Sequence, residues 1–299
     1  MKDPQSGIFS DQSTHFHMLE YGINVGVTLS EIRGDLDRVL RIVRKPVHLV
    51  VGMGATLWRL INPDAIPSGL RSFDSVSGVD GMVAPSTQND ILLWLHSESH
   101  DELVDAVMAV NEIMKPSAAL HVDLPGFRYR DSRDLTGFVD GSANPKADQR
   151  QEVALVPEGQ PGAGGSFMMT QKWIHKLVEF KKLNVVAQEK VIGRTKTDSI
   201  ELEGDDMPAD SHVSRTDLKV DEEGVKMYRR SVPFANAQEQ GLYFLAFAGE
   251  LRRFDLLLSR MYGNYGDGLR DRLLDFSTPV TGGYWFAPSK PDLHAALQR

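Results

Sequence analysis

The chain has 299 residues, a formal net charge of -8 and no cysteine. The acidic balance argues against nucleic acid and against an anionic membrane surface as partners. A chain without cysteine has no disulfides, no thiolate nucleophile, no iron–sulfur cluster and no haem attached through Cys-x-x-Cys-His.

The N-terminal stretch "MKDPQSGIFSDQSTHFHMLEYG" has charged residues and a proline where a secretory signal needs an uninterrupted apolar run. No window is apolar for the length of a membrane span. We therefore expect a cytoplasmic protein without a membrane partner. The length favours two domains.

The first half of the chain contains the same helical pattern twice. A capping box of Thr28 and Glu31 opens a run of apolar residues at helical spacing that stops at Pro46. The same design begins again at Ser99 and stops at Pro116. Both segments are predicted to be amphipathic helices.

Apolar runs of strand length flank these two helices. They cover residues 15–23, 47–54, 90–96 and 119–127. The order is therefore strand, helix, strand, strand, helix, strand. This order is typical of the ferredoxin-like plan, an antiparallel sheet with both helices on one face.

The second half is predicted to contain the same kinds of element with longer insertions. The expected strands and helices are 164–173, 174–180, 241–249, 250–263 and 279–288. We expect an α+β protein with two ferredoxin-like domains, 1–132 and 133–299. A long polar insert at about 185–225 interrupts the second, and such inserts are often functional.

Spacing alone selects none of the nine histidines as a metal ligand. His15 and His17 share one strand face, but no third ligand is near in sequence. His96 and His100 lie at a helix start, where we expect solvated side chains. His212 lies in the polar insert, where a partly exposed histidine is the ordinary interpretation.

Two further strings contain residues that suit chemistry. Asp140 lies in "LTGFVDGSANP", and Asp-Gly followed by Asn-Pro is typical of turns. The string "YRRSVPF" carries Arg229 and Arg230 and is typical of an edge strand with solvated arginines. Neither string identifies a catalytic residue by itself.

Taken together, however, five strings resemble a known family. In chain order they are "GFVDGSANP", "VIGRTK", "SHVSR", "YRRSVPF" and "FSTPVTGGYWFAPS". The combination resembles the dye-decolorizing peroxidases, specifically their bacterial B-type branch, over a region from about Gly7 to Ser289. The resemblance implies two ferredoxin-like domains and a non-covalent haem b in the C-terminal one.

Carried over position by position, the resemblance makes His212 the proximal ligand of the haem iron. Asp275 is our candidate for the carboxylate that orients this imidazole. Asp140 and Arg229 would lie on the distal face as proton shuttle and charge stabiliser. Arg194 resembles the residue that pairs with a haem propionate.

Several neighbours are assigned less directly. Arg230 follows Arg229 and is the alternative for the distal arginine. Lys196 is a weaker candidate for the propionate contact. Ser231 and Phe234 are expected to shape the distal pocket.

The resemblance implies that hydrogen peroxide is reduced through a ferryl intermediate and that dyes, phenols or other one-electron donors are oxidised. Bulky aromatic donors would react at the surface or at the haem edge. Aromatic residues that could relay oxidising equivalents, or simply pack in the core, are Tyr129, Trp173, Tyr284 and Trp285. A homo-oligomer is expected because open sheets leave edges to cover.

Two other functions stay open at this level. One is a haem-binding or porphyrin-binding protein, or an iron-release protein, with incidental peroxidase activity. The other is different haem chemistry on the same fold, such as chlorite dismutation.

Overall fold

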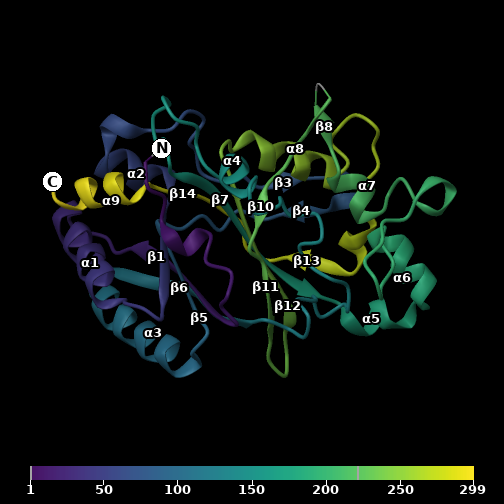
Figure 1. Cartoon of the computed structure of the whole chain (residues 1–299), viewed down its shortest axis with the longest axis horizontal. Coiled ribbons are helices and arrows are strands. Elements are labelled where there is room, and N and C mark those ends of the chain that lie inside the picture. Colours follow the sequence, from purple (N-terminus) through teal and green to yellow (C-terminus); the bar gives the residue numbers. More distant parts are fainter. Residues whose placement is uncertain (1, 221) are drawn as a thin grey trace.

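The computed structural model describes residues 2–220 and 222–299. The fold is α+β, and one large antiparallel sheet runs through both halves of the chain with helices on its outer faces (Figure 1). The strand order in this sheet is β10-β12-β7-β14-β2-β5-β1-β6, with β11 paired to β12 and β13 paired to β7.

The N-terminal half supplies the part β2-β5-β1-β6. Its strands are β1 (His15–Ile23), β2 (His48–Met53), β5 (Ile91–Ser97) and β6 (Ala118–Phe127). The connections are α1 (Leu29–Ile42) between β1 and β2 and α3 (His100–Met114) between β5 and β6. The expected sequence of strands and helices is confirmed in this half.

Local interactions explain where these two helices begin. The Thr28 hydroxyl accepts a hydrogen bond from the backbone of Glu31, whose carboxylate accepts the Thr28 N–H at 2.8 Å. The Ser99 hydroxyl accepts from the backbone of Glu102 at 3.4 Å. These side chains satisfy N–H groups that a helix start leaves without a partner.

The C-terminal half supplies the part β10-β12-β7-β14. Its strands are β7 (Ser166–His175), β10 (Tyr228–Arg229), β11 (Val232–Ala235), β12 (Gln240–Ala248), β13 (Ser277–Pro279) and β14 (Gly283–Ala287). The helix α8 (Arg252–Met261) connects β12 to the strands that follow. Between β7 and β10 the chain forms α5 (Leu177–Lys182), α6 (Val185–Ile192) and α7 (His212–Thr216).

The remaining α-helices and strands are short. They are the helices α2 (Ala55–Ile61), α4 (Arg150–Ala154) and α9 (Lys290–Leu297) and the strand pairs β3 (Val76–Ser77) with β4 (Val83–Ala84) and β8 (Lys219–Val220) with β9 (Glu223–Gly224). Among the described residues, no helix is both long and apolar enough to cross a bilayer.

The sheet is continuous across the two halves, and this differs from the expectation of two separate sheets. Phe286 of β14 pairs with Met53 of β2 and joins the halves. At the other end β6 contacts β11, so the sheet is nearly closed. The alternation of apolar and polar residues in a strand shows which of its faces is buried, but it does not show which other strand pairs with it. The sequence therefore did not predict the pairing of β14 with β2.

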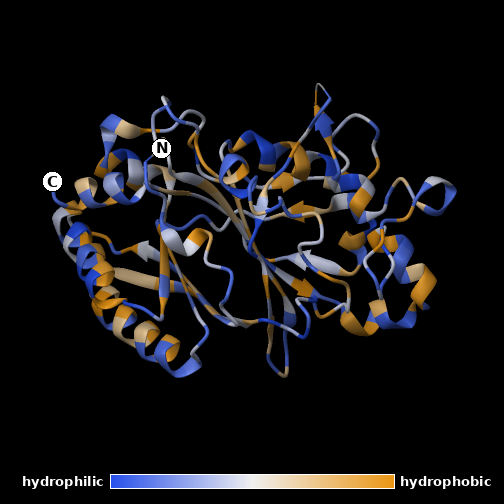
Figure 2. Ribbon diagram, in the orientation of Figure 1, coloured by the Kyte–Doolittle hydropathy of each residue, from blue (hydrophilic) through white to orange (hydrophobic). Residues whose placement is uncertain are grey.

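Apolar side chains fill both faces of the sheet. The inner cluster contains Met18, Trp94, Leu245, Phe247 and Trp285, all fully or almost fully buried. The outer faces are covered by helices, and Figure 2 shows α1 and α3 with both hydrophobic and hydrophilic residues along their length. The inserted helices α5, α6 and α7 lie at the far end from α1 and α3 (Figure 1).

Candidate active site

The loop that carries Asp140 depends on two glycines in the left-handed region, Gly137 with φ +94° and Gly141 with φ +80°. A Cβ at Gly137 would also lie 2.7 Å from the side chain of Lys196. The Asp140 N–H donates to the Ser132 carbonyl at 3.0 Å. The backbone of this loop is therefore fixed, and the glycines explain the composition of the string.

Asn144 joins this loop to the strand that carries Arg229. Its side-chain oxygen accepts the Arg229 N–H at 2.9 Å, and its side-chain nitrogen donates to the Arg229 carbonyl at 2.9 Å. This two-point contact places Asp140 and Arg229 on the wall of one cavity of about 190 Å³. Sequence reasoning missed Asn144 because an Asn-Pro pair was explained by the turn alone.

Burial raises the pKa of Asp140 above its ordinary value. The positive charge of Arg229 works against this rise, and the negative charge of Asp134 adds to it. His212 also acts on this carboxyl electrostatically, so the loop and the insert face a common region. A carboxyl with a raised pKa exchanges protons more readily near neutral pH than an ordinary aspartate.

The Arg229 guanidinium forms no hydrogen bond or ion pair with any residue that the structure describes, and its Nε is buried without a partner. A buried, unpaired cationic donor is costly unless a ligand satisfies it. Arg229 therefore fits a group that develops negative charge beside it.

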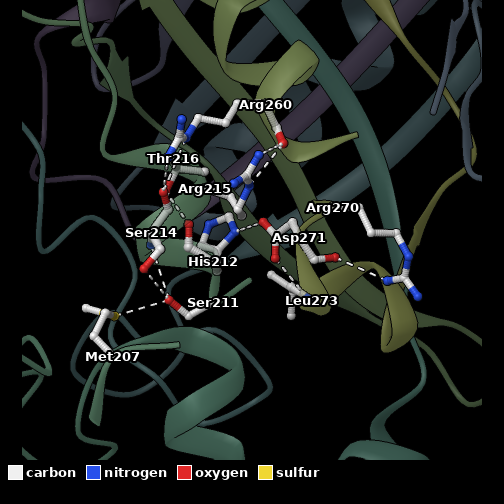
Figure 3. A network of polar contacts seen from close by, with 10 residues as sticks. All are labelled: Met207, Ser211, His212, Ser214, Arg215, Thr216, Arg260, Arg270, Asp271 and Leu273. Carbon is white, nitrogen blue, oxygen red and sulfur yellow. Dashed lines mark hydrogen bonds and ion pairs between the residues drawn. The ribbon is translucent and has the colours of Figure 1, made fainter. Parts of the chain in front are cut away.

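His212 is the first residue of α7, in the insert that was predicted to be functional. Its Nδ1 lies 2.6 Å from Oδ2 of Asp271, whose side chain is completely buried (Figure 3). The other oxygen of Asp271 accepts the Leu273 N–H at 2.8 Å, which fixes the carboxylate. A carboxylate in this position favours the tautomer with the proton on Nδ1.

The opposite ring nitrogen of His212, Nε2, has no hydrogen-bond partner within the described residues, and the side chain is 28% exposed. An imidazole that donates from Nδ1 to a carboxylate and keeps a free lone pair on Nε2 has the usual arrangement of a metal-ligating histidine. The residues present therefore fit an iron porphyrin at this position.

The prediction that Asp275 orients His212 is wrong. Asp275 instead forms an ion pair with Arg270 at 2.8 Å, and Arg270 also contacts Asp80 at 2.9 Å. Asp271 is the N-cap and Asp275 the last residue of the 3₁₀ helix η5 (Arg272–Asp275), so the two carboxylates have different partners. The two aspartates are only four positions apart in the sequence. The conformation of this turn determines which of them reaches His212.

Gly193 packs the end of α6 against the His212 turn. Its φ is +94°, and a Cβ there would lie 2.8 Å from Val213 and 3.0 Å from the Ser211 hydroxyl. The next residue, Arg194, is thereby held close to His212. Its guanidinium donates to the Ser199 carbonyl at 3.0 Å and pairs with Glu201.

The structure also places the other expected residues. Ser231 and Tyr129 line the cavity with Arg229. Phe234, expected in the distal pocket, packs in the inner core and is not among the residues that line this cavity. The remaining relay candidates Trp173, Tyr284 and Trp285 are buried core residues.

His212 can ligate iron, Asp140 can transfer protons, and Arg229 can stabilise negative charge. These are the three functions that a peroxidase with bound iron needs from its protein. The family models agree: "Dyp-type peroxidase, N-terminal" matches residues 5–128, and "Dyp-type peroxidase, C-terminal" matches residues 131–292. The chain belongs to the Dyp-type peroxidase family and is a peroxidase.

Curated relatives support this assignment. A dye-decolorizing peroxidase from Mycolicibacterium paratuberculosis is 32% identical over 88% of this chain and 76% of its own length. A dye-decolorizing peroxidase from Mycobacterium tuberculosis is 33% identical over 87% of this chain and 79% of its own length.

Solved structures share the fold over almost the whole chain. DyPB from Rhodococcus jostii has a TM-score of 0.89 and 31% identity, covering 98% of this chain and 97% of its own. A dye-decolorizing protein from Vibrio cholerae has a TM-score of 0.87 and 36% identity, covering 98% and 99%. One variant of the Rhodococcus protein was solved in complex with haem, with a TM-score of 0.89 and 30% identity, covering 99% of both chains.

Proposed function

We propose that this peroxidase holds a non-covalent haem b between His212 on one side and Asp140 with Arg229 on the other. The observation that carries the proposal is that, within the described residues, His212 Nε2 and the buried Arg229 Nε have no hydrogen-bond partner and lie on elements that face a common region. When bound, haem supplies the iron at which hydrogen peroxide is reduced and aromatic one-electron donors are oxidised.

His212 would hold the haem iron through Nε2. Its Nδ1–H is donated to Asp271, which increases the basicity of Nε2 and holds the ring in one orientation. Because Asp271 is completely buried and also bound to the Leu273 N–H, it has little freedom to release the imidazole.

Asp140 and Arg229 divide the work on peroxide between them. Asp140 takes a proton from one peroxide oxygen and delivers it to the other, the one that leaves. Arg229 stays charged and stabilises the negative charge that develops as the O–O bond breaks. The cavity that both residues line admits peroxide from the surface.

Arg194 is proposed to pair with a haem propionate. Its position beside the His212 turn supports this role, and a guanidinium is suited to bind a carboxylate. Its present partner Glu201 would then share it or turn away, since the Glu201 side chain is 44% exposed.

We also propose that each half is a ferredoxin-like unit, with the boundary between residues 132 and 133, and that the chain is of the B-type branch. The strand orders β2-β5-β1-β6 and β11-β12-β7-β14 support the first point. The likeness to DyPB supports the second. The strand order of each unit is the one that four strands with two crossovers adopt in this plan.

A homo-oligomer in the cytoplasm is proposed as well. The valines Val178, Val185 and Val186 on the neighbouring helices α5 and α6 are largely exposed, and such side chains favour a partner surface. Hydrogen peroxide and aromatic donors are the proposed substrates.

The test is a titration of the purified protein with hemin, followed by one equivalent of peroxide in a stopped-flow spectrometer. We expect a Soret band that shifts rapidly in the wild type. Asp140→Asn and Arg229→Leu should keep the band and slow the shift by about a hundredfold or more. Arg252→Gln, on the exposed side of α8, is the matched control.

Other outcomes would identify the alternatives. Hemin binding without a response to peroxide would point to a haem carrier and would contradict the proposal. Rapid oxygen release from chlorite with a slow peroxide reaction would point to chlorite dismutation.

The pH dependence of the same reaction tests the role of Asp140. The proton acceptor must be ionised, so the rate should rise with pH as Asp140 loses its proton. Because burial raises the pKa of Asp140, this rise should occur above the ordinary value of 3.8. The Asp140→Asn variant should lose this step, and an unchanged step would assign it to another group.

A further inference from the structure

The cavity that contains Asp140 and Arg229 has an outer wall that peroxide chemistry does not explain. Five arginines line the cavity: Arg128, Arg133, Arg150, Arg229 and Arg230. Among the described residues, the aspartates that line it with them are Asp11 and Asp140, and Arg133 is paired with Asp131 at 2.9 Å beside the cavity. This is a local excess of positive charge in a chain whose net charge is -8.

Two of these arginines bind only uncharged partners among the described residues. Arg128 donates to the carbonyls of Asp11 and Ser13 at 2.8 and 2.9 Å. Arg230 donates to the carbonyls of Ile8 and Ser10 at 2.8 and 2.7 Å. A carbonyl satisfies a donor but does not neutralise its charge, so Arg128 keeps an attractive field for an anion, whereas the Asp11 carboxylate acts electrostatically on Arg230.

Two other arginines leave donors free. The Nε atoms of Arg150 and Arg229 are buried and have no hydrogen-bond partner in the part of the chain that the structure describes. Arg150 does form an ion pair with Asp11 at 2.8 Å, but through another nitrogen. Buried donors without a partner are uncommon in folded proteins. The peroxide reaction already uses Arg229, so the Arg150 Nε is the donor on this wall that fits a further ligand with acceptor oxygens.

The same wall carries aromatic side chains. Phe127 and Tyr129 meet edge to face with ring centroids 6.3 Å apart, and Phe16 and Tyr228 also line the cavity. A planar ring is a suitable neighbour for such side chains. Hydrogen peroxide is small and uncharged, and it requires neither aromatic walls nor a cluster of cations.

We propose that this cavity binds the aromatic electron donor itself, and that it selects small phenols that carry a carboxylate. The aromatic wall holds the ring, and Arg128 and Arg150 attract the carboxylate. The inference rests on the proposed function, because the cofactor oxidised by peroxide is the oxidant. Each bound phenol gives one electron to that cofactor and its phenolic proton to water, and leaves as a phenoxyl radical.

A matched pair of donors isolates the charge. These are 3-(4-hydroxyphenyl)propionate and its methyl ester, which share the same phenol and differ in charge two carbons from the ring. The hemin-loaded wild type should show a higher kcat/KM for the acid than for the ester. Added salt should reduce this selectivity ratio because it screens the attraction.

Two kinds of variant test the wall. Arg128→Gln should lower the ratio of kcat/KM for the acid to kcat/KM for the ester about tenfold, the range of one charge-assisted hydrogen bond.

Ser132 is exposed on the cavity rim with φ +69°, a conformation that both Asp and Asn tolerate. Ser132→Asp should lower the ratio, whereas the neutral match Ser132→Asn should keep it. Arg252→Gln is the distant arginine control.

Binding without turnover gives a second readout. Calorimetric titration of the holoenzyme with 3-phenylpropionate, which has no phenol to oxidise, should give a Kd about tenfold weaker in Arg128→Gln. Equal ratios in the wild type, Arg128→Gln and Ser132→Asp would overturn the inference. A loaded protein that ignores peroxide but still binds 3-phenylpropionate at this wall would instead overturn the proposed function alone.

Discussion

The two halves of the molecule share a strand order but use it differently. In the N-terminal half, α1 and α3 lie along the outer face, and their residues Leu36, Val39 and Val110 are completely buried. In the C-terminal half, the connection from β7 to β10 is broken into short helices, and His212 starts one of them. The same sheet plan thus yields a filled core on one side and a site on the other.

A histidine from each half shows the difference most clearly. His96 is completely buried, with Nδ1 2.7 Å from the Ser13 hydroxyl and Nε2 3.0 Å from the Gly7 carbonyl. His212 has one nitrogen bound to Asp271, and the other has no partner among the residues that the structure describes. A histidine with both nitrogens satisfied by protein supports the fold, whereas one with a single free nitrogen can serve a ligand.

The largest expected effect comes from the removal of the His212 side chain. His212→Ala should lower kcat/KM with peroxide by more than about a hundredfold and weaken hemin binding, because the iron loses its protein ligand. Hemin titration and stopped-flow spectroscopy measure both. His294→Ala, exposed on α9, is the control. Full activity in His212→Ala would mean that the ligand lies elsewhere.

The next effect tests the correction from Asp275 to Asp271. Asp271→Asn should reduce peroxide reactivity by about 10- to 100-fold, because a neutral amide supports the imidazole less well than a carboxylate. Asn also caps a helical turn, so the local fold should be kept. Asp275→Asn should change reactivity by less than about twofold, since it removes only a partly exposed ion pair. The reverse ranking would restore Asp275 as the partner.

A third effect belongs to the N-terminal half and concerns stability. Burial lowers the pKa of His96 from 6.5 to about 3, with Arg230 and His48 acting in the same direction. The unfolded chain therefore takes up a proton below pH 6.5 while the folded chain does not. Stability from this residue is complete above pH 6.5 and is lost as the pH falls toward 3.

Between pH 7 and 5 the loss should be about 2 kcal/mol, because the slope approaches 1.36 kcal/mol per pH unit only below pH 6.5, where the unfolded histidine is mostly protonated. Urea unfolding at both pH values measures it. His96→Gln should be less stable at neutral pH but less sensitive to acid than the wild type, whereas His294→Gln should behave like the wild type. An equal acid sensitivity in His96→Gln would assign the loss to other groups.

The smallest effect lies at the start of α1. Thr28→Ala removes a side chain that accepts the Glu31 N–H, and the free energy of unfolding should fall by about 1 kcal/mol. Thr28→Ser keeps the hydroxyl and should lose less. Thermal unfolding of the two variants decides the point, and equal losses would show that the cap contributes little to this half.

Local patterns predicted much of the fold. Apolar spacing and capping residues located α1, α3 and the four strands of the first half, because a helix and a strand bury their faces with different periods. The same reasoning expected His96 to be solvated, which is wrong, since a strand that is buried on both faces does not show which polar residue it carries inward.

The sequence by itself determined which residues are available: the glycines around Asp140, the arginine string and the histidine of the insert. Tertiary structure alone decided that β14 joins β2, that Asp271 rather than Asp275 holds His212, and that Asn144 ties the Asp140 loop to Arg229. The reason is physical. Periodicity and turn chemistry act over a few neighbouring residues, whereas these contacts join segments far apart in the chain, whose meeting depends on how the whole sheet closes.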